Sequence, residues 1–153
     1  MIEIAFCFDR KMVHPACVAI GSLLDNKQDE EIHYEISCIC PEDTKQYREM
    51  LENVVEKRDK QSKIKFYPAP EKFGDAFEIR DISVSAYLRL LLHRILEDKE
   101  RIIYADVDVL FLDSLKGIWN RDISDALLAG VKGANNFQDK WKECIQRSYG
   151  KEL

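Results

Sequence analysis

Runs of apolar residues alternate along the chain with amphipathic stretches, in the way expected when strands and helices follow one another. Residues 1–8 form a nearly continuous apolar run broken only by Glu3, which is typical of a strand buried on both faces. Further strands are predicted at residues 32–40, 64–67, 101–105 and 126–131. The first strand is therefore expected near the centre of a sheet.

Helical spacing appears between these strands. Pro15 favours the first turn of one helix, whose predicted inner stripe comprises Val18, Leu23 and Leu24. Pro41 opens a second helix, with apolar residues at 47, 51, 54 and 55. Ser83 or Ser85 can cap a third helix. Its apolar surface is broad, which implies that the helix is buried, and is formed by Leu88, Leu91, Leu92, Ile95 and Leu96. A loop at 68–82, a helical turn at 115–119 and a helix at 138–148 complete the prediction.

This order predicts an α/β fold with a mostly parallel sheet, arranged as a single domain over residues 1–153. The chain is 46% hydrophobic and 33% charged, which is ordinary for a folded globular protein. In parallel sheets, ligands bind beyond the carboxyl ends of the strands. Chemically active residues are therefore expected directly after the predicted strands.

Acidic residues stand at two of these ends. Asp9 follows the first strand, and Asp106 and Asp108 follow the strand at 101–105. Two carboxylates one residue apart repel each other, and a cation between them removes the repulsion. Hard divalent ions such as Mg²⁺ take carboxylate oxygens together with substrate phosphates. The pair therefore indicates a metal-diphosphate site, and two solvated aspartates in a turn are the alternative.

Charge and cysteine content narrow the function. The net charge of −5 does not suggest a nucleic-acid partner. Five cysteines without zinc-type spacing are interpreted as small buried side chains in a reducing compartment. The chain starts without the features of a leader and holds no stretch approaching the ~20 apolar residues of a membrane span. We therefore expect a cytoplasmic protein without a transmembrane segment.

Four segments, at residues 4–9, 17–23, 82–89 and 101–110, together resemble family 8 of the retaining glycosyltransferases. This family includes bacterial lipopolysaccharide galactosyl- and glucosyltransferases and the glycogenins. The likeness covers essentially the whole chain. It implies a GT-A, Rossmann-like nucleotide-sugar-binding fold in which Mn²⁺, or Mg²⁺, bridges an Asp-x-Asp motif to the diphosphate of a UDP-sugar.

The resemblance also implies roles for individual residues. Asp106 and Asp108 match the metal-binding positions, and Arg89 matches an arginine that reaches toward donor sugar and phosphate. The positions expected to surround the nucleotide are Cys7, Phe8, Asp9, Lys11, Ile82 and Val107. Without the resemblance, Arg89 would be interpreted as the partner of an acid on the helix surface. Arg10 and Lys11 stand where relatives carry an acid and a small amide.

Family members continue beyond the length of this chain with a catalytic segment and a His-x-x-Gly-x-x-Lys-Pro-Trp stretch, whose histidine is the third protein ligand of the metal. The chain thus resembles the donor-binding half of a transferase that moves a hexose to a glycan or lipopolysaccharide acceptor. Its catalytic residues are expected outside this sequence.

Other functions stay open at this point. They include a non-catalytic nucleotide-sugar-binding remnant, half of a split transferase, a phosphotransferase of the haloacid-dehalogenase type and a receiver-like signalling domain. A shortened sheet edge favours self-association. A position at the inner face of a bacterial membrane is an alternative to a freely cytoplasmic one.

Overall fold

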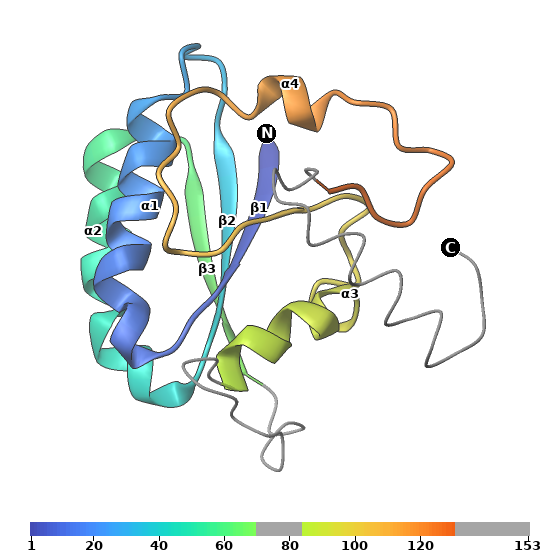
Figure 1. Ribbon diagram of the computed structural model, residues 1–153. Helices are drawn as coiled ribbons and strands as arrows, with labels where there is room; N and C mark the ends of the chain where they lie inside the picture. Colours follow the sequence, from blue (N-terminus) through green and yellow to red (C-terminus); the bar gives the residue numbers. More distant parts are fainter. Residues whose placement is uncertain (70–83, 131–153) are drawn as a thin grey trace, which may run out of the picture. The chain divides into compact units, whose positions relative to one another are not determined.

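The computed structural model describes residues 1–69 and 84–130, and the chain divides into two compact units, Met1–Arg121 and Asp122–Leu153. In the described part of the first unit, four strands form one sheet: β1 (Ile2–Cys7), β2 (Tyr34–Cys40), β3 (Lys63–Pro68) and β4 (Ile103–Tyr104). Their order is β3-β2-β1-β4, and each neighbouring pair runs parallel (Figure 1). The predicted α/β class with a parallel sheet is confirmed.

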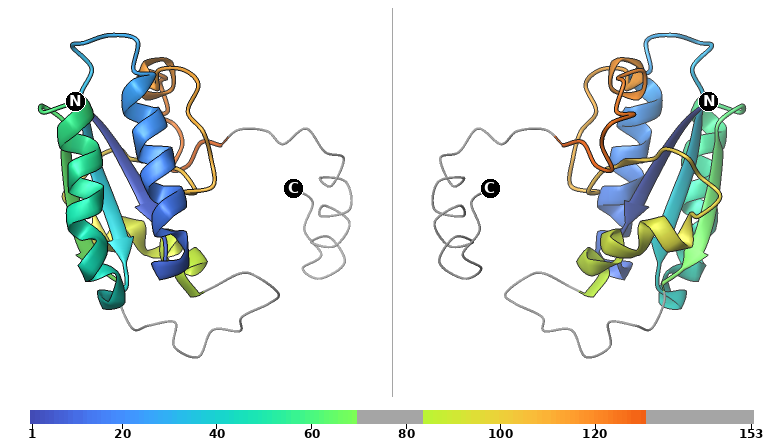
Figure 2. Two further views of the ribbon diagram at one scale, coloured as in Figure 1. Left: turned by 90° about the vertical axis from the view of Figure 1, so that its left-hand side faces the viewer. Right: turned by 90° about the vertical axis from the view of Figure 1, so that its right-hand side faces the viewer.

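Helices cover both faces of the sheet. Helices α1 (Val13–Asp25) and α2 (Arg48–Arg58) lie side by side on one face, as Figure 1 and Figure 2 show. The 3-10 turns η1 (Arg10–Met12) and η2 (Glu42–Tyr47) lead into them. The segment made of η4 (Val84–Leu91) and α3 (Leu92–Ile95) packs on the opposite face. A short helix, α4 (Lys116–Trp119), follows β4.

The side chains of β1 alternate between two hydrophobic cores. Ile4 and Phe6 belong to the core shared with α1 and α2. Ala5 and Cys7 point to the other face, where they pack with Leu88 in a second, smaller core. Both faces of the strand are buried, which explains the unbroken apolar run at the start of the sequence.

The third predicted helix differs from expectation in type and in burial. Residues 84–91 wind as a 3-10 helix, and only residues 92–95 are α-helical. Leu88 and Leu91 lie three residues apart, so they share a face in a 3-10 helix. Leu88 and Leu96 are buried, whereas the side chain of Leu90 is exposed. The apolar surface of this segment is therefore only partly covered.

Two other predictions were wrong. Val18 lies on the outer face of α1 and is 59% exposed, because the buried stripe runs through positions such as Ala16, Ile20 and Leu23. Residues 126–130 are not a strand: no strand in the described ranges pairs with them, and Leu127 and Leu128 are exposed. An apolar run forms a stable strand only where a neighbour accepts its backbone hydrogen bonds.

Several predicted elements are only partly observed. The strand predicted at residues 101–105 is shorter, comprising only Ile103–Tyr104. Residues 70–83, which include most of the predicted loop, and the helix predicted at residues 138–148 lie outside the described residues. No helix in the ranges 1–69 and 84–130 is long and apolar enough to cross a membrane.

Candidate functional site

The carboxyl ends of β1 and β4 meet at one edge of the sheet. The two strands are parallel, with Ala5 opposite Tyr104. The backbone N–H of Ala105 donates to the carbonyl oxygen of Ala5 at 3.2 Å. Because β1 leads to Asp9 and β4 leads to Asp106, the acidic residues predicted to share an edge follow two adjacent strands. This is the edge at which open α/β sheets bind ligands.

Asp106 is the centre of a three-residue cluster. Its Oδ1 atom accepts a hydrogen bond from the hydroxyl of Tyr104 at 2.5 Å and lies 3.4 Å from Nη2 of Arg89. The guanidinium carbon of Arg89 stands 5.3 Å from the centroid of the Tyr104 ring. The ion pair is partly exposed, with 40% of the Arg89 side chain and 49% of the Asp106 side chain accessible. Asp106 is therefore both held in place and open to solvent.

Val107 anchors the tripeptide, while the two aspartates remain at the surface. The side chain of Val107 is 5% exposed and joins the core formed with α1 and α2. Asp106 and Asp108 on either side of it are exposed. Burying the central valine stabilises the position of the turn, while the carboxylates keep their hydration. Val107 therefore supports the site by packing.

Cys7 lies behind this cluster. Burial raises the pKa of its thiol to about 12, with the positive charge of Arg89 acting against the rise and the negative charge of Asp106 adding to it. The pKa of Tyr104 also lies above its ordinary value, because of burial and of the hydrogen bond and charge of Asp106. Neither group ionises near neutral pH. Cys7 thus acts as a small core side chain rather than as a nucleophile.

The residues after β1 are organised by Asp9. Its Oδ1 atom accepts a hydrogen bond from the backbone N–H of Lys11 at 2.9 Å and thereby caps η1. Phe8 is buried, and its N–H donates to the carbonyl oxygen of Ile39 at 3.2 Å. The side chain of Lys11 is exposed. Any contact of Phe8 with a ligand at this edge would thus use its backbone, whereas Lys11 can offer a charge.

The structure brings together some of the predicted residues and adds one. Arg89 and Asp106 form an ion pair, and the charges of both influence the pKa of the Cys7 thiol. Ile82 lies outside the described residues. Tyr104 was missed by the sequence analysis, although it precedes Asp106 by two residues at the end of a strand. That spacing places both side chains on the same side of an extended chain. The signal was present, but the sequence analysis placed residue 104 only within a predicted strand.

The two aspartates fit a hard divalent cation in type but do not complete its coordination. Carboxylate oxygens are the ligands that Mg²⁺ and Mn²⁺ accept. Among the residues that the structure describes, no group of three or more His, Cys, Asp or Glu side chains converges to hold a metal. A cation here would therefore take its further ligands from water, from phosphate or from protein outside these residues.

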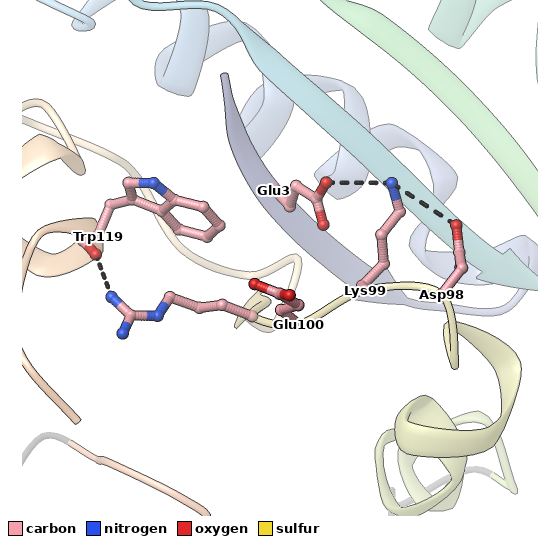
Figure 3. A pocket seen from close by; sticks show the side chains of 6 residues that line it. Glu3, Asp98, Lys99, Glu100 and Trp119 are labelled. Carbon is pink, nitrogen blue, oxygen red and sulfur yellow. Dashed lines mark hydrogen bonds and ion pairs between the residues drawn. The ribbon is translucent and has the colours of Figure 1, made fainter. Parts of the chain in front are cut away.

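A hollow of about 630 Å³ lies near the amino-terminal ends of β1 and β4, away from the candidate site, and is lined by Glu3, Lys99, Arg101 and Trp119, among others (Figure 3). The ammonium of Lys99 is bound to two carboxylates, at 3.1 Å from Glu3, which lines the hollow, and at 2.6 Å from Glu35. Arg101 donates to the backbone carbonyl oxygen of Trp119. These partners hold Lys99 and Arg101 in place, so we assign the hollow a structural role.

Comparison with known proteins identifies the family. Residues 3–151 match the model of glycosyl transferase family 8. The chain belongs to this family. The resemblance inferred from the four sequence segments is thereby confirmed.

Similar structures agree with this assignment and with the GT-A fold. An active-site mutant of LgtC is similar with a TM-score of 0.70 and 27% identity, over 81% of this chain and 44% of that chain. The galactosyltransferase LgtC in complex with donor and acceptor sugar analogs gives a TM-score of 0.68 at 27% identity, over 79% and 43%. The bifunctional glycosyltransferase WbbM shares the fold at 16% identity, with a TM-score of 0.68 over 86% of this chain and 23% of that chain.

A curated relative from Haemophilus influenzae, named as a glycosyltransferase, is 35% identical over 92 residues. Those residues make up 59% of this chain and 27% of the relative. The family 8 chain described here thus spans less than half the length of LgtC and about a quarter of the Haemophilus influenzae protein.

Proposed function

We propose that this family 8 chain binds a UDP-sugar and a divalent metal at the carboxyl edge of β1 and β4, as the donor-binding part of a retaining hexosyltransferase. The cluster of Arg89, Tyr104 and Asp106 carries the proposal, because it places a guanidinium beside an exposed carboxylate at the ligand-binding edge. The presence of donor and acceptor sugar analogs in the LgtC complex supports it.

In this proposal Asp106 and Asp108 hold Mn²⁺ or Mg²⁺, and Arg89 contacts the diphosphate. A guanidinium suits phosphate because its planar fork donates two parallel hydrogen bonds. A bound divalent ion would stabilise the negative charge of the leaving UDP. Both roles concern the donor. The transfer step itself is assigned to residues outside the described part of this chain.

The remaining predicted residues would surround the nucleotide. In this proposal the base of the nucleotide contacts Asp9, the backbone of Cys7 and Phe8, and Ile82. Lys11 extends from η1 and adds a positive charge near the nucleotide. Val107 contributes its backbone, because its side chain is buried. Residues 1–153 would then act as one nucleotide-sugar-binding domain that is incomplete relative to the longer family members.

The acceptor assigned by analogy with the family is a glycan or a lipopolysaccharide. A cytoplasmic location, at the inner face of a bacterial membrane, agrees with such an acceptor. Self-association through the edge of the shortened sheet is the further expectation, because β4 has a strand neighbour on only one side within the described residues.

Isothermal titration calorimetry of the full chain tests donor binding. UDP should release heat in the presence of Mn²⁺ and much less after chelation of the metal. Asp106→Asn should weaken the metal-dependent binding about tenfold or more, because a charged ligand of the metal is lost. The matched control is Asp98→Asn, which removes the same charge near the hollow at the amino-terminal ends of β1 and β4. Absence of heat at about 1 mM UDP would refute the proposal.

A non-catalytic nucleotide-sugar-binding protein is the second candidate. The lack of a third metal-ligating side chain near Asp106 and Asp108, within the described residues, favours it. Slow release of sugar from UDP-galactose or UDP-glucose distinguishes the two functions. A chain that keeps part of the transfer chemistry should hydrolyse the donor slowly in the absence of acceptor, whereas a binding protein should release no sugar above the level seen with Asp106→Asn.

A further inference from the structure

The carboxylate assigned to the metal already has a positive partner in the protein. Nη2 of Arg89 lies 3.4 Å from Oδ1 of Asp106, and the hydroxyl of Tyr104 donates to the same oxygen at 2.5 Å. The Oδ2 atom takes part in neither contact. Arg89 and Tyr104 are also in contact with each other, since the guanidinium carbon is 5.3 Å from the ring centroid. The charge of Asp106 is therefore balanced before any metal binds.

The positive charge of Arg89 beside Asp106 opposes the binding of a metal cation to the same carboxylate. A divalent ion bound by Asp106 would carry its charge within a few ångströms of Arg89, where like charges repel even through water. The ion pair is partly exposed, so Arg89 can leave the carboxylate without exposing a buried charge. Because Asp106 is already paired with Arg89, its apparent affinity for a metal ion is lower than that of an unpaired carboxylate.

We propose that Arg89 takes the place of the metal charge at Asp106 in the metal-free protein and transfers to the donor diphosphate when metal and nucleotide bind together. The inference rests on the proposed function, because it takes Asp106 as a metal ligand and a nucleoside diphosphate as the ligand. One arginine–carboxylate contact is exchanged for a metal–carboxylate contact and an arginine–phosphate contact. Tyr104 keeps its hydrogen bond to Oδ1 during the exchange, so Asp106 would offer Oδ2 to the metal.

The exchange requires Arg89 to affect two affinities in opposite directions. Arg89→Met removes the charge and keeps an apolar stem that can lie over Tyr104. The variant should bind Mn²⁺ alone about three- to tenfold more tightly than the wild type, because the competing charge is gone. With Mn²⁺ saturating, it should bind UDP about ten- to a hundredfold more weakly, because a charge-assisted bond to phosphate is lost. A residue with a merely structural role would weaken both affinities.

The experiment uses the full chain and two titrations. Mn²⁺ affinity is measured from the electron paramagnetic resonance signal of the free ion, and UDP affinity at saturating Mn²⁺ by calorimetry. Arg89→Lys keeps the charge and should leave the Mn²⁺ affinity near that of the wild type. Arg94→Met is the matched control, because it removes a positive charge from the exposed side of the neighbouring helix α3. This control should change neither affinity by more than about twofold, since salt screens distant surface charges.

The outcomes separate the inference from the proposed function. Opposite changes in Arg89→Met support the exchange. Parallel weakening, no change in either affinity, or an equal gain of Mn²⁺ affinity in Arg94→Met would overturn it while wild-type UDP binding still stands. No binding of UDP by the wild type with Mn²⁺ would overturn both. Thermal unfolding monitors the fold, and Arg89→Gln repeats both titrations should Arg89→Met lose its structure.

Discussion

Asp59 connects the end of α2 to the starts of β2 and β3, so its removal should destabilise the sheet. Its side chain is 5% exposed. It accepts bonds from Lys27 at 3.1 Å, from His33 at 2.9 Å and from Ser62 at 2.7 Å. The Ser62 hydroxyl oxygen in turn accepts the N–H of Tyr34 at 2.8 Å, at the first residue of β2. The carboxylate thus fixes three elements at once.

Asp59→Asn keeps the size of the side chain and removes its charge. Two charged or chargeable donors and a hydroxyl then meet a neutral amide, and one of the amide's polar atoms can only donate. Breaking a buried charged network of this kind costs about 3–5 kcal/mol. Because Lys27 and His33 keep some exposure and can turn to water, we expect a somewhat smaller cost, about 2–4 kcal/mol.

Urea unfolding of both chains, followed by circular dichroism, measures this difference. With a slope of about 2 kcal/mol/M, in the middle of the usual range, the midpoint should fall by about 1–2 M. Asp98→Asn is the control, and its exposed site should leave the free energy of unfolding within about 0.5 kcal/mol of the wild type. A loss below about 0.5 kcal/mol in Asp59→Asn would refute the assignment of Asp59 as the centre of this network.

The loss of stability in Asp59→Asn should also depend on pH, in a direction that the pKa of Asp59 determines. Burial alone would raise the pKa of Asp59, but hydrogen bonds from His33, Ser62, the Gln61 backbone and Lys27 outweigh it and hold the pKa well below its ordinary value. A lowered folded-state pKa contributes stability above the unfolded pKa, and this contribution is lost as the pH falls. The difference in the free energy of unfolding between the wild type and Asp59→Asn should therefore become smaller below about pH 4. A difference that stays constant down to the lowest pH at which both chains remain folded would contradict this reasoning.

Three further outcomes are expected. Lys99→Met should lower the free energy of unfolding by about 2–4 kcal/mol in urea, because Lys99 is 11% exposed and lies 2.6 Å from the carboxylate of Glu35. Unchanged stability would show that Lys65, the other ammonium partner of Glu35, is sufficient to hold that carboxylate. Tyr104→Phe should weaken Mn²⁺ binding about two- to tenfold, because Asp106 loses the bond that orients it, and an unchanged affinity in a resonance titration would refute that role. The thiol of Cys7 should resist iodoacetamide in the native chain and react only after unfolding, as peptide mapping would show; rapid native modification would contradict its burial.

The local patterns of the sequence predicted the sheet elements well. The apolar run at residues 1–8 contains β1, and the alternation at 32–40 contains β2, because side-chain periodicity directly reflects which faces of a strand are buried. The prediction failed where the neighbour of a segment decides its form. Residues 126–130 have the apolar composition of a strand, yet no partner strand accompanies them in the described ranges. The outer position of Val18 likewise depends on which side of α1 meets the sheet.

For the candidate site, the sequence alone determined the two aspartates, their place after a strand and the family likeness of the segments around them. Only the tertiary structure decided that β4 pairs with β1, which brings Tyr104 and Asp106 beside Cys7. Only the packing of η4 on the sheet decided that Arg89 reaches the carboxylate of Asp106. The physical reason is that residue spacing encodes the faces of a single element, whereas contacts between elements depend on strand order and on the burial of distant apolar surfaces.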